Sequence, residues 1–577
     1  MTVQRGVCCV APGYAAGCVF GAYSNGFVAM LALALAVVQR GSWVRRRAYS
    51  SPRACSQALA AGIASFVVGL ALAGCTVGPD YSREPAPVPT EFKELKGWKL
   101  AHPSDNLDRG DWWTVYRDRG LDTLLPQVEI SNQTVAADAA AYEEARAIIR
   151  EGQAALFPVA TASYSATRTR TGALAGTTGG SAVGVGLGTR YTTQYSAPIS
   201  GSWDIDVWGR LRRQVESDTA AAQASAADLD NAKLSQQAML ATAYFNLRAS
   251  DSLIDLLERT IAEYKKTYDI VNNQFKAGYS VTAGDVATAD ANIRTTEAQL
   301  ATARSSRAQF EHAIAVLIGR PPAELGIAPR DLGGGIPRTP IIVPSTLLER
   351  RPDIAASERT MQEQNALIGV AEAAYFPDIS LSSMIQFIGP IPLPFSAARS
   401  IGSIAATGTQ TLFNGGLTAA QVDAARAVYW ESVANYRQTV LTAFQQVEDQ
   451  LAAIRFLSQQ LGAERRAVAD ERKAVDVFLN QFKAGTVAFT TVVVAEVALL
   501  ADQESELTAR QNLFLASVSL IEDLGGGWDT TQLPTQVQLE NGFSFFQKLP
   551  PTPPALVESA PAEASAPGPP PTAPAGQ

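Results

Sequence analysis

The chain has 577 residues, a formal net charge of −8 and a pI of about 5.2, which argues against a basic surface that binds nucleic acid. It has only two histidines, and all five cysteines fall within the first 75 residues. A zinc site, a histidine-based catalytic centre or a disulfide in the body is therefore poorly supported. We find no Walker A loop and no G-x-S-x-G elbow, so the sequence predicts neither an enzyme nor a cofactor.

The N-terminal region has the pattern of a secretory signal. Arg45, Arg46 and Arg47 precede an apolar stretch of small residues that ends in Leu-Ala-Gly-Cys at Cys75. This ending resembles the bacterial lipobox, and the resemblance implies that diacylglycerol and palmitate are attached to Cys75. Because Thr76 follows and not an aspartate, we expect sorting to the outer membrane.

Residues 1–43 do not fit a signal that begins at Met1, because a second apolar run precedes the basic cluster. We interpret 1–43 as the product of a start site assigned too early. An alternative bacterial start codon at Val44 would give a signal peptide over 44–74.

An internal repeat runs through the body of the chain. The hexapeptide from Asn273 to Gly278 recurs from Asn480 to Gly485, an offset of 207. Upstream, Phe157-Pro158 recurs as Phe376-Pro377 at an offset of 219. The change of 12 falls in the Gly-rich stretch from Thr171 to Gly188, which reads as a longer hairpin loop. We infer a tandem duplication.

Each copy changes its hydrophobic period twice. Residues 130–155 and 347–373 have helical spacing, whereas the runs that begin at Tyr191 and Ile379 alternate between apolar and polar residues, as strands do. We also predict strands at 157–168 and 401–413. Each copy thus contributes a strand pair.

Long helices follow Gly209 and Gly416. Apolar residues recur every seven positions in both copies, which predicts packed, supercoiled helices. These are Leu240, Leu247, Ile254, Ile261, Tyr268 and Phe275, and then Val447, Ile454, Leu461, Val468, Val475 and Phe482. A helix from Gly209 to Gly278 would span roughly 100 Å at 1.5 Å per residue. A second helix would return to Gly319 in the first copy.

Four strands per chain cannot close a barrel, because small barrels need about eight. If the apolar face of the strands meets lipid, closure must come from other subunits, since open edges would leave unpaired backbone groups. The long hairpins exceed the thickness of a bilayer and must project into the periplasm. The predicted fold class is therefore an α+β membrane protein: a tandem duplication gives four strands to an oligomeric β-barrel and long helical hairpins to an α-barrel.

Three motifs carry a family resemblance. Residues 75–81 (CTVGPDY) resemble the opening of mature NodT-type outer-membrane lipoproteins, which are TolC-like members of the outer-membrane efflux family in resistance-nodulation-division systems. Residues 347–354 (LLERRPDI) resemble the motif that opens their second repeat. Residues 484–487 (AGTV), followed by Thr491 and Val492, resemble their second helical tip. The resemblance covers about residues 75–528.

This resemblance implies a homotrimer with a 12-stranded barrel and a periplasmic tunnel whose tips dock onto an adaptor protein below an inner-membrane pump. The docking residues that it implies are Gly278, Gly485, Phe275, Phe482, Thr486 and Val487. The glycines could also be plain helix caps, and the phenylalanines core residues.

In TolC, aspartates six and nine residues after the second tip glycine narrow the entrance. This chain has Thr491 and Val494 there, while Asp285 lies seven residues after Gly278, so one residue is inserted in copy one. The candidate gate residues that the resemblance implies are therefore Asp285, Thr491 and Val494, of which only Asp285 is acidic.

The expected function is a passive exit duct for drugs or other small molecules, bound to outer-membrane lipids. The alternatives are a type I protein-secretion duct and a structural coiled-coil surface protein.

The sequence predicts seven divisions of the chain. They are a leader (1–43), a signal peptide (44–74), an anchor and linker (75–129), repeat 1 (130–335), repeat 2 (336–528), a C-terminal segment (529–549) and a disordered Pro/Ala-rich tail (550–577).

Overall fold

A computed structural model describes residues 76–89, 91–94, 111–171, 190–279, 281–333, 349–392 and 400–541. The chain divides into two units, Met1–Gly74 and Cys75–Gln577, and every described residue belongs to the second. Cys75, the leader, the signal peptide and the Pro/Ala-rich tail lie outside the described residues. So does the Gly-rich stretch from 172 to 189.

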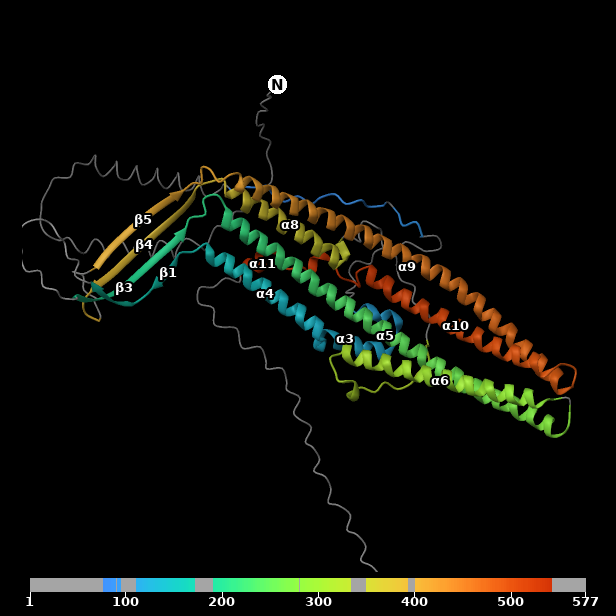
Figure 1. Cartoon of the computed structure of the whole chain (residues 1–577). Helices are drawn as coiled ribbons and strands as arrows, with labels where there is room; N and C mark the ends of the chain where they lie inside the picture. The colour runs from blue at the N-terminus through green and yellow to red at the C-terminus, as the bar shows by residue number, and fades with distance from the viewer. Residues whose placement is uncertain are drawn as a thin grey trace, which may run out of the picture. The chain divides into compact units, whose positions relative to one another are not determined.

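The elements follow one order twice (Figure 1). The first series is α4 (Gln133–Ala155), β1 (Val159–Ala162), β2 (Ser165–Thr171), β3 (Arg190–Asp204), α5 (Arg210–Lys276) and α6 (Ala283–Leu317). The second is α8 (Pro352–Ala373), β4 (Asp378–Gly389), β5 (Ser400–Thr409), α9 (Leu417–Lys483) and α10 (Phe489–Asp523). Outside these series lie η1 (Trp112–Tyr116), α3 (Arg119–Ser131), η2 (Pro322–Glu324), η4 (Thr530–Gln532) and α11 (Gln536–Glu540).

The strands form one antiparallel sheet in which β3 and β4 are central, β5 pairs with β4, and both β1 and β2 pair with β3. The first predicted strand is thus split, with one register kept on both sides of the gap at Ser163 and Tyr164. Pro198 lies opposite Ser163, and the Pro198 carbonyl accepts a hydrogen bond from the Ser163 N–H at 3.0 Å. Since proline has no N–H to return, the ladder breaks there. The last strand also ends at Thr409, before the predicted limit of 413.

The two hairpins share one register. Val159 pairs with Ser202, and shifting these residues by 219 and 207 gives Asp378 and Thr409, which also pair. The offsets that relate the two copies in the sequence therefore also relate the paired backbone positions of the two hairpins.

The long helices have the predicted length. α5 and α9 each contain 67 residues, and α6 and α10 each contain 35. At 1.5 Å per residue, α5 and α9 each extend about 100 Å. Within the described part of the chain, no helix combines the length and the apolar character needed to cross a membrane.

The heptad positions fill the core where the hairpins meet other helices. Leu240, Leu247 and Val447 are fully buried. The pattern fails at the far end of α5, where Phe275 is 44% exposed. The largest core cluster lies midway, where α5, α6 and α10 meet η1 and α3; Tyr116, Phe245 and Phe514 pack there ring against ring.

Candidate functional site

The helical reversals at the far ends of the hairpins are the first candidate site (Figure 1). Gly278 and Gly485 have φ angles of +77° and +76°, in the left-handed region that favours glycine. The N–H of Tyr279 bonds to the carbonyl of Gln274, and the N–H of Gly278 bonds to that of Phe275. Thr486 and Gly485 repeat both bonds. Each glycine therefore ends its helix in a Schellman motif, as the sequence predicts for a reversal.

The two returning helices begin differently. Thr282 and Asp285 form a reciprocal capping box at the start of α6, in which the Asp285 carboxylate accepts from the Thr282 N–H at 2.8 Å. α10 begins after Ala488, which has no side-chain cap, and Thr491 takes the place of Asp285. The first reversal spans 277–282 and the second 484–488, so the inserted residue lies inside the first. Asp285 thus has a structural role as the cap of α6, which is separate from the gate role that the family resemblance implies.

The predicted tip phenylalanines lie in different environments. Phe482 is buried against Phe489, with a centroid distance of 5.5 Å, in a cluster with Val271 and Val492. Phe275 is largely exposed. The described surface at the reversals therefore includes Phe275, the two glycines, Tyr279, Thr486 and the half-buried Val487. Val494, 70% exposed, lies one turn into α10 and points away from this core.

A buried carboxylate joins the two hairpins near the reversals. Glu496 on α10 accepts a hydrogen bond from the Thr267 hydroxyl on α5 at 2.7 Å, and its backbone carbonyl accepts one from the Tyr264 hydroxyl at 3.2 Å. Burial raises the pKa of Glu496 to about 7, and nearby Glu263 adds to the rise, although the Thr267 hydrogen bond opposes it. No sequence pattern identified this residue.

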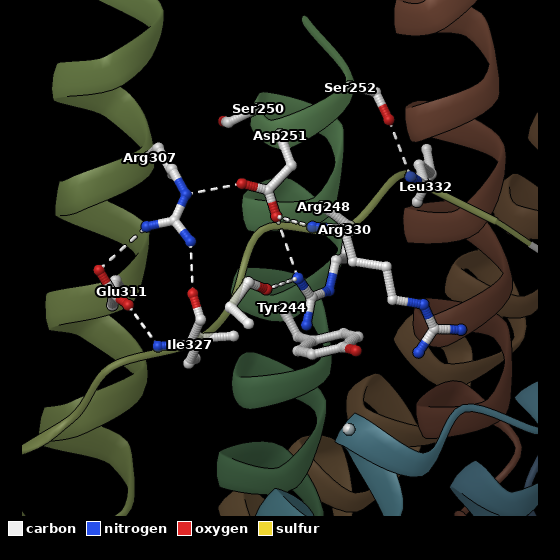
Figure 2. Close-up of polar contacts among 12 residues, drawn as sticks. Tyr244, Arg248, Ser250, Asp251, Ser252, Arg307, Glu311, Ile327, Arg330 and Leu332 are labelled. Carbon is white, nitrogen blue, oxygen red and sulfur yellow. Dashed lines mark hydrogen bonds and ion pairs between the residues drawn. The ribbon is translucent and has the colours of Figure 1, made fainter. Parts of the chain in front are cut away.

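A second buried polar network ties the segment after η2 to the hairpin (Figure 2). Asp251 on α5 pairs with Arg307 Nε at 2.6 Å and with Arg248 Nη1 at 3.0 Å, and it accepts the Arg330 N–H at 3.0 Å. Arg307 also donates to the Ile327 carbonyl at 2.5 Å.

Glu311 extends this network: it pairs with Arg307 at 3.1 Å and accepts the Ile327 N–H at 2.6 Å. Arg248 lies over the Tyr244 ring, 4.7 Å from its centroid. Since the side chain of Asp251 is almost fully buried and accepts from three donors, its charge is well compensated. The network fixes residues 327–332 against α5 and α6.

The junction between the sheet and the long helices holds the start of the described chain. The Val77 N–H bonds to the Trp208 carbonyl at 3.0 Å, and Thr76 lies against Gly209. Arg213 on α5 donates to the carbonyls of Val77 and Gly78 and pairs with Asp80 at 2.8 Å. Residue 76 is therefore held where β3 ends and α5 begins.

The second arginine of the LLERRPDI motif, Arg351, has a capping role. Arg351 pairs with Asp353 and donates to the Asp523 carbonyl at the end of α10 at 3.1 Å. Asn132, which precedes α4 as Arg351 precedes α8, donates to the Leu317 carbonyl at the end of α6 at 2.8 Å. In both series, the residue before the first helix thus caps the last one.

Comparisons with known proteins agree with this geometry. A family model described as outer membrane efflux protein matches residues 124–320 and 343–526. The chain is 28% identical over 466 residues to the cation efflux system protein CusC of Escherichia coli K12, across 80% of this chain and 98% of that protein. It is 28% identical over 490 residues to the probable efflux pump outer membrane protein TtgC of Pseudomonas putida, across 84% and 98%.

Solved structures give the same result. The outer-membrane channel OprN matches with a TM-score of 0.71 and 28% identity, across 79% of this chain and all of that one. A CusC crystal structure matches with a TM-score of 0.69 and 26% identity, across 78% and 100%. Since the family model covers well over half of the 577 residues, the chain belongs to the outer membrane efflux protein family.

Proposed function

We propose that this chain is the outer-membrane duct of a tripartite efflux system: a passive channel through which an inner-membrane resistance-nodulation-division pump, joined by a periplasmic adaptor, expels drugs or other small molecules. The observation that carries the proposal is the family match across both series of elements. Relatives are named for cation and antibiotic efflux, which leaves the substrate of this chain open.

Helix length supports a periplasmic extension. α5 and α9 each reach about 100 Å, about three times the 30 Å hydrocarbon core of a bilayer. The sheet continues directly into both helices. If the strands lie in the outer membrane, the reversals reach deep into the periplasm, where an adaptor would meet Phe275, Gly278 and Gly485. Phe482, being buried, would support this surface from within.

Closure of a barrel requires further copies. Within the described sheet, β1, β2 and β5 each pair on one side only. Antiparallel edges in lipid must be paired, which favours a ring of several chains. Three copies with four strand positions each would give the 12 strands that the family resemblance implies. In this proposal the two series of elements arose by tandem duplication.

The lipid anchor fits the same arrangement. Residue 76 lies at the junction of β3 and α5, where a barrel would leave the membrane. Acyl chains on Cys75 would then start at the level of the inner leaflet. A duct anchored in this way needs no cofactor and no catalytic residue.

Conductance tests the proposal directly. The purified oligomer in planar bilayers should give discrete single-channel currents. Expression with its pump and adaptor should restore drug resistance to a strain that lacks its own outer-membrane duct. An oligomer that inserts but never conducts would overturn the proposal in favour of a structural coiled-coil protein. Secretion of a polypeptide without any effect on drug resistance would favour the type I alternative.

A further inference from the structure

The register of the sheet defines an apolar face. Residues directly opposite each other in an antiparallel ladder point to the same side, so Ile199 shares its side with Ile385. Ile404, which lies opposite Ser383, belongs to that side too. The three isoleucines are at least half exposed, and the opposite face carries mainly serine, threonine and glutamine. If the sheet lies in the outer membrane, the isoleucine side is the one that meets lipid.

Two arginines interrupt this apolar face. Arg168 lies opposite Thr193 in the ladder between β2 and β3, and Arg170 lies opposite Tyr191. Both partners are an even number of residues from Ile199, so both arginines point to the apolar face. The Arg168 guanidinium accordingly lies over the Tyr191 ring, 4.9 Å from its centroid. Both arginine side chains are exposed, and among the described strand residues they are the only charged ones on this face.

The arginines lie about one membrane thickness from the helices. β3 runs away from the junction with α5 (Figure 1), and Trp203 marks the junction end of the apolar face, where its Nε1 donates to the Leu156 carbonyl at 2.9 Å. Thr193, opposite Arg168, lies ten positions before Trp203 in β3. At about 3.4 Å per residue and a tilt of about 40°, ten residues rise roughly 25 Å, the height of the apolar band of an outer-membrane barrel. Arg168 and Arg170 therefore lie at the headgroup level of the leaflet farther from the helices, which is the outer leaflet.

Aromatic side chains mark the same level. Tyr164 stacks on Tyr195 with a centroid distance of 6.4 Å, and Tyr191 is 54% exposed beside the arginines. Aromatic residues gather at both interfaces of membrane barrels. These tyrosines and Trp203 at the junction thus bound the lipid-facing band on its two sides.

Charge along the sheet is one-sided. The sequence has no acidic residue between Glu151 and Asp204, or between Asp378 and Asp423. The basic residues of these two stretches are Arg168, Arg170, Arg190 and Arg399. Asp204 and Asp378 themselves lie at the junction ends of β3 and β4. The outer end of the sheet therefore carries positive charge without a carboxylate of its own strands to neutralise it.

We propose that Arg168 and Arg170 bind the phosphate groups of lipid A, the phosphorylated glycolipid of the outer leaflet. The proposal rests on the proposed outer-membrane duct, because that duct places the sheet in the bilayer. Two residues on one face of a strand lie about 7 Å apart, close enough for both guanidinium groups to contact one headgroup. Arginine binds phosphate through two parallel N–H donors, which a lysine cannot do. The hydroxyl of Tyr191, opposite Arg170, adds a further donor at this level.

Lipid binding to the purified full-chain oligomer tests the proposal. Native mass spectrometry in detergent compares bisphosphorylated lipid A with its dephosphorylated form, and the wild type should bind the phosphorylated form more tightly. Arg168→Gln with Arg170→Gln should weaken binding of bisphosphorylated lipid A by at least about tenfold, because charge-assisted hydrogen bonds are lost. The dephosphorylated lipid should bind wild type and variant equally.

Two control variants separate position from charge. Arg146→Gln removes an arginine that lies over Tyr142 at 5.7 Å on α4, away from the sheet, and should leave the affinity for lipid A unchanged. Adding Thr167→Arg and Thr169→Arg to the double glutamine variant restores the net charge on the opposite face of β2. This variant should bind lipid A as weakly as the double glutamine variant.

The outcomes separate the lipid site from the duct. Equal binding of the two lipids by wild type, or unchanged affinity in the double glutamine variant, would overturn the lipid site. Competition by phosphatidylglycerol or inorganic phosphate as effective as that by lipid A would also overturn it, since the site would then not select this glycolipid. Single-channel currents from the double glutamine variant should persist, so the duct stands whichever way binding falls. A wild-type oligomer that never conducts would instead refute the proposed function.

Discussion

Glu496 shows how a single residue can make the stability of the tip region depend on pH. Its carboxyl group lies between α5 and α10, where burial raises its pKa from the ordinary 4.5 to about 7. A raised carboxyl pKa means that ionisation is less favourable in the folded state. The folded state is therefore most stable below the ordinary pKa and loses stability as pH rises from about 4.5 to 7.

Glu496→Gln should remove this loss, because glutamine keeps an oxygen for the Thr267 hydroxyl and carries no charge. At pH 8 the variant should be more stable than wild type by up to about 3 kcal/mol, and near pH 4.5 the difference should vanish. Thermal unfolding of the detergent-solubilised oligomer at both pH values measures this. Glu506→Gln, on the same helix and paired with Arg465, is the matched control. An equal gain in stability at both pH values would show that ionisation of Glu496 does not cause the loss.

Asp251 is a second residue whose role depends on burial. Asp251→Asn leaves Arg248 and Arg307 without their shared counter-charge, and breaking a buried pair in this way costs about 3–5 kcal/mol. Because Asp251 also holds the Arg330 N–H, we expect trypsin to cut after Arg330 much faster in the variant. Asp255→Asn, one turn along α5 in an exposed pair with Arg259, should leave the cleavage rate unchanged. Unchanged cleavage in Asp251→Asn would show that other contacts hold the segment.

Sequence patterns do not reveal such residues. Asp251 and Glu496 are ordinary acidic residues in long amphipathic helices, and nothing in their local sequence separates them from exposed neighbours such as Asp255. Their burial depends on which helices and loops pack there. Phe275 and Phe482 make the same point: the hexapeptides around them are identical, yet one side chain is exposed and the other buried. Phe482 is buried by Phe489 of its own hairpin together with Val271 of the other, and the identical hexapeptides do not specify these neighbours.

At the scale of elements, the sequence predicted helix bounds much better than it predicted the burial of single residues. The heptads and the glycines at their ends predicted both long helices to within two residues, because helix length here follows from local periodicity and from positive φ at Gly278 and Gly485. The break in the first strand was missed. Its cause, Pro198, lies in the partner strand, which itself stays continuous. A local pattern locates a proline but does not show which residue opposite loses its hydrogen bond.

The second reversal allows a prediction about docking. A Cβ at Gly485 would meet no atom within 4 Å, so Gly485→Trp should cost only the roughly 1–2 kcal/mol of a left-handed residue with a side chain. The oligomer should remain heat-resistant and inserted, while the indole obstructs the proposed adaptor surface. Crosslinking to the adaptor should fall and drug sensitivity should rise. Gly485→Ala carries the same backbone strain without the bulk and should retain crosslinking and resistance. If both variants behave like wild type, the glycine is a plain cap.

At the scale of the whole molecule, we expect membrane attachment and assembly to be separable. The described chain begins beside Trp208 and Gly209 and is held there by Arg213. Residues further along the same segment reach α9, where Phe92 packs on Phe444. The segment after the proposed anchor is thus held by its own contacts, so we expect its position to stay the same without acyl chains.

Cys75→Ser tests this separation. The serine variant has no thiol for diacylglycerol, so incorporation of labelled palmitate should be abolished. A closed barrel satisfies its own backbone hydrogen bonds in lipid, whereas acyl chains add only about 0.8 kcal/mol per buried CH₂. The variant, exported with a conventional cleavable signal in place of residues 1–74, should therefore still insert as a heat-resistant oligomer and conduct in planar bilayers. Continued palmitate labelling would refute the lipoprotein assignment. Loss of the oligomer together with the label would show that the anchor is needed for assembly.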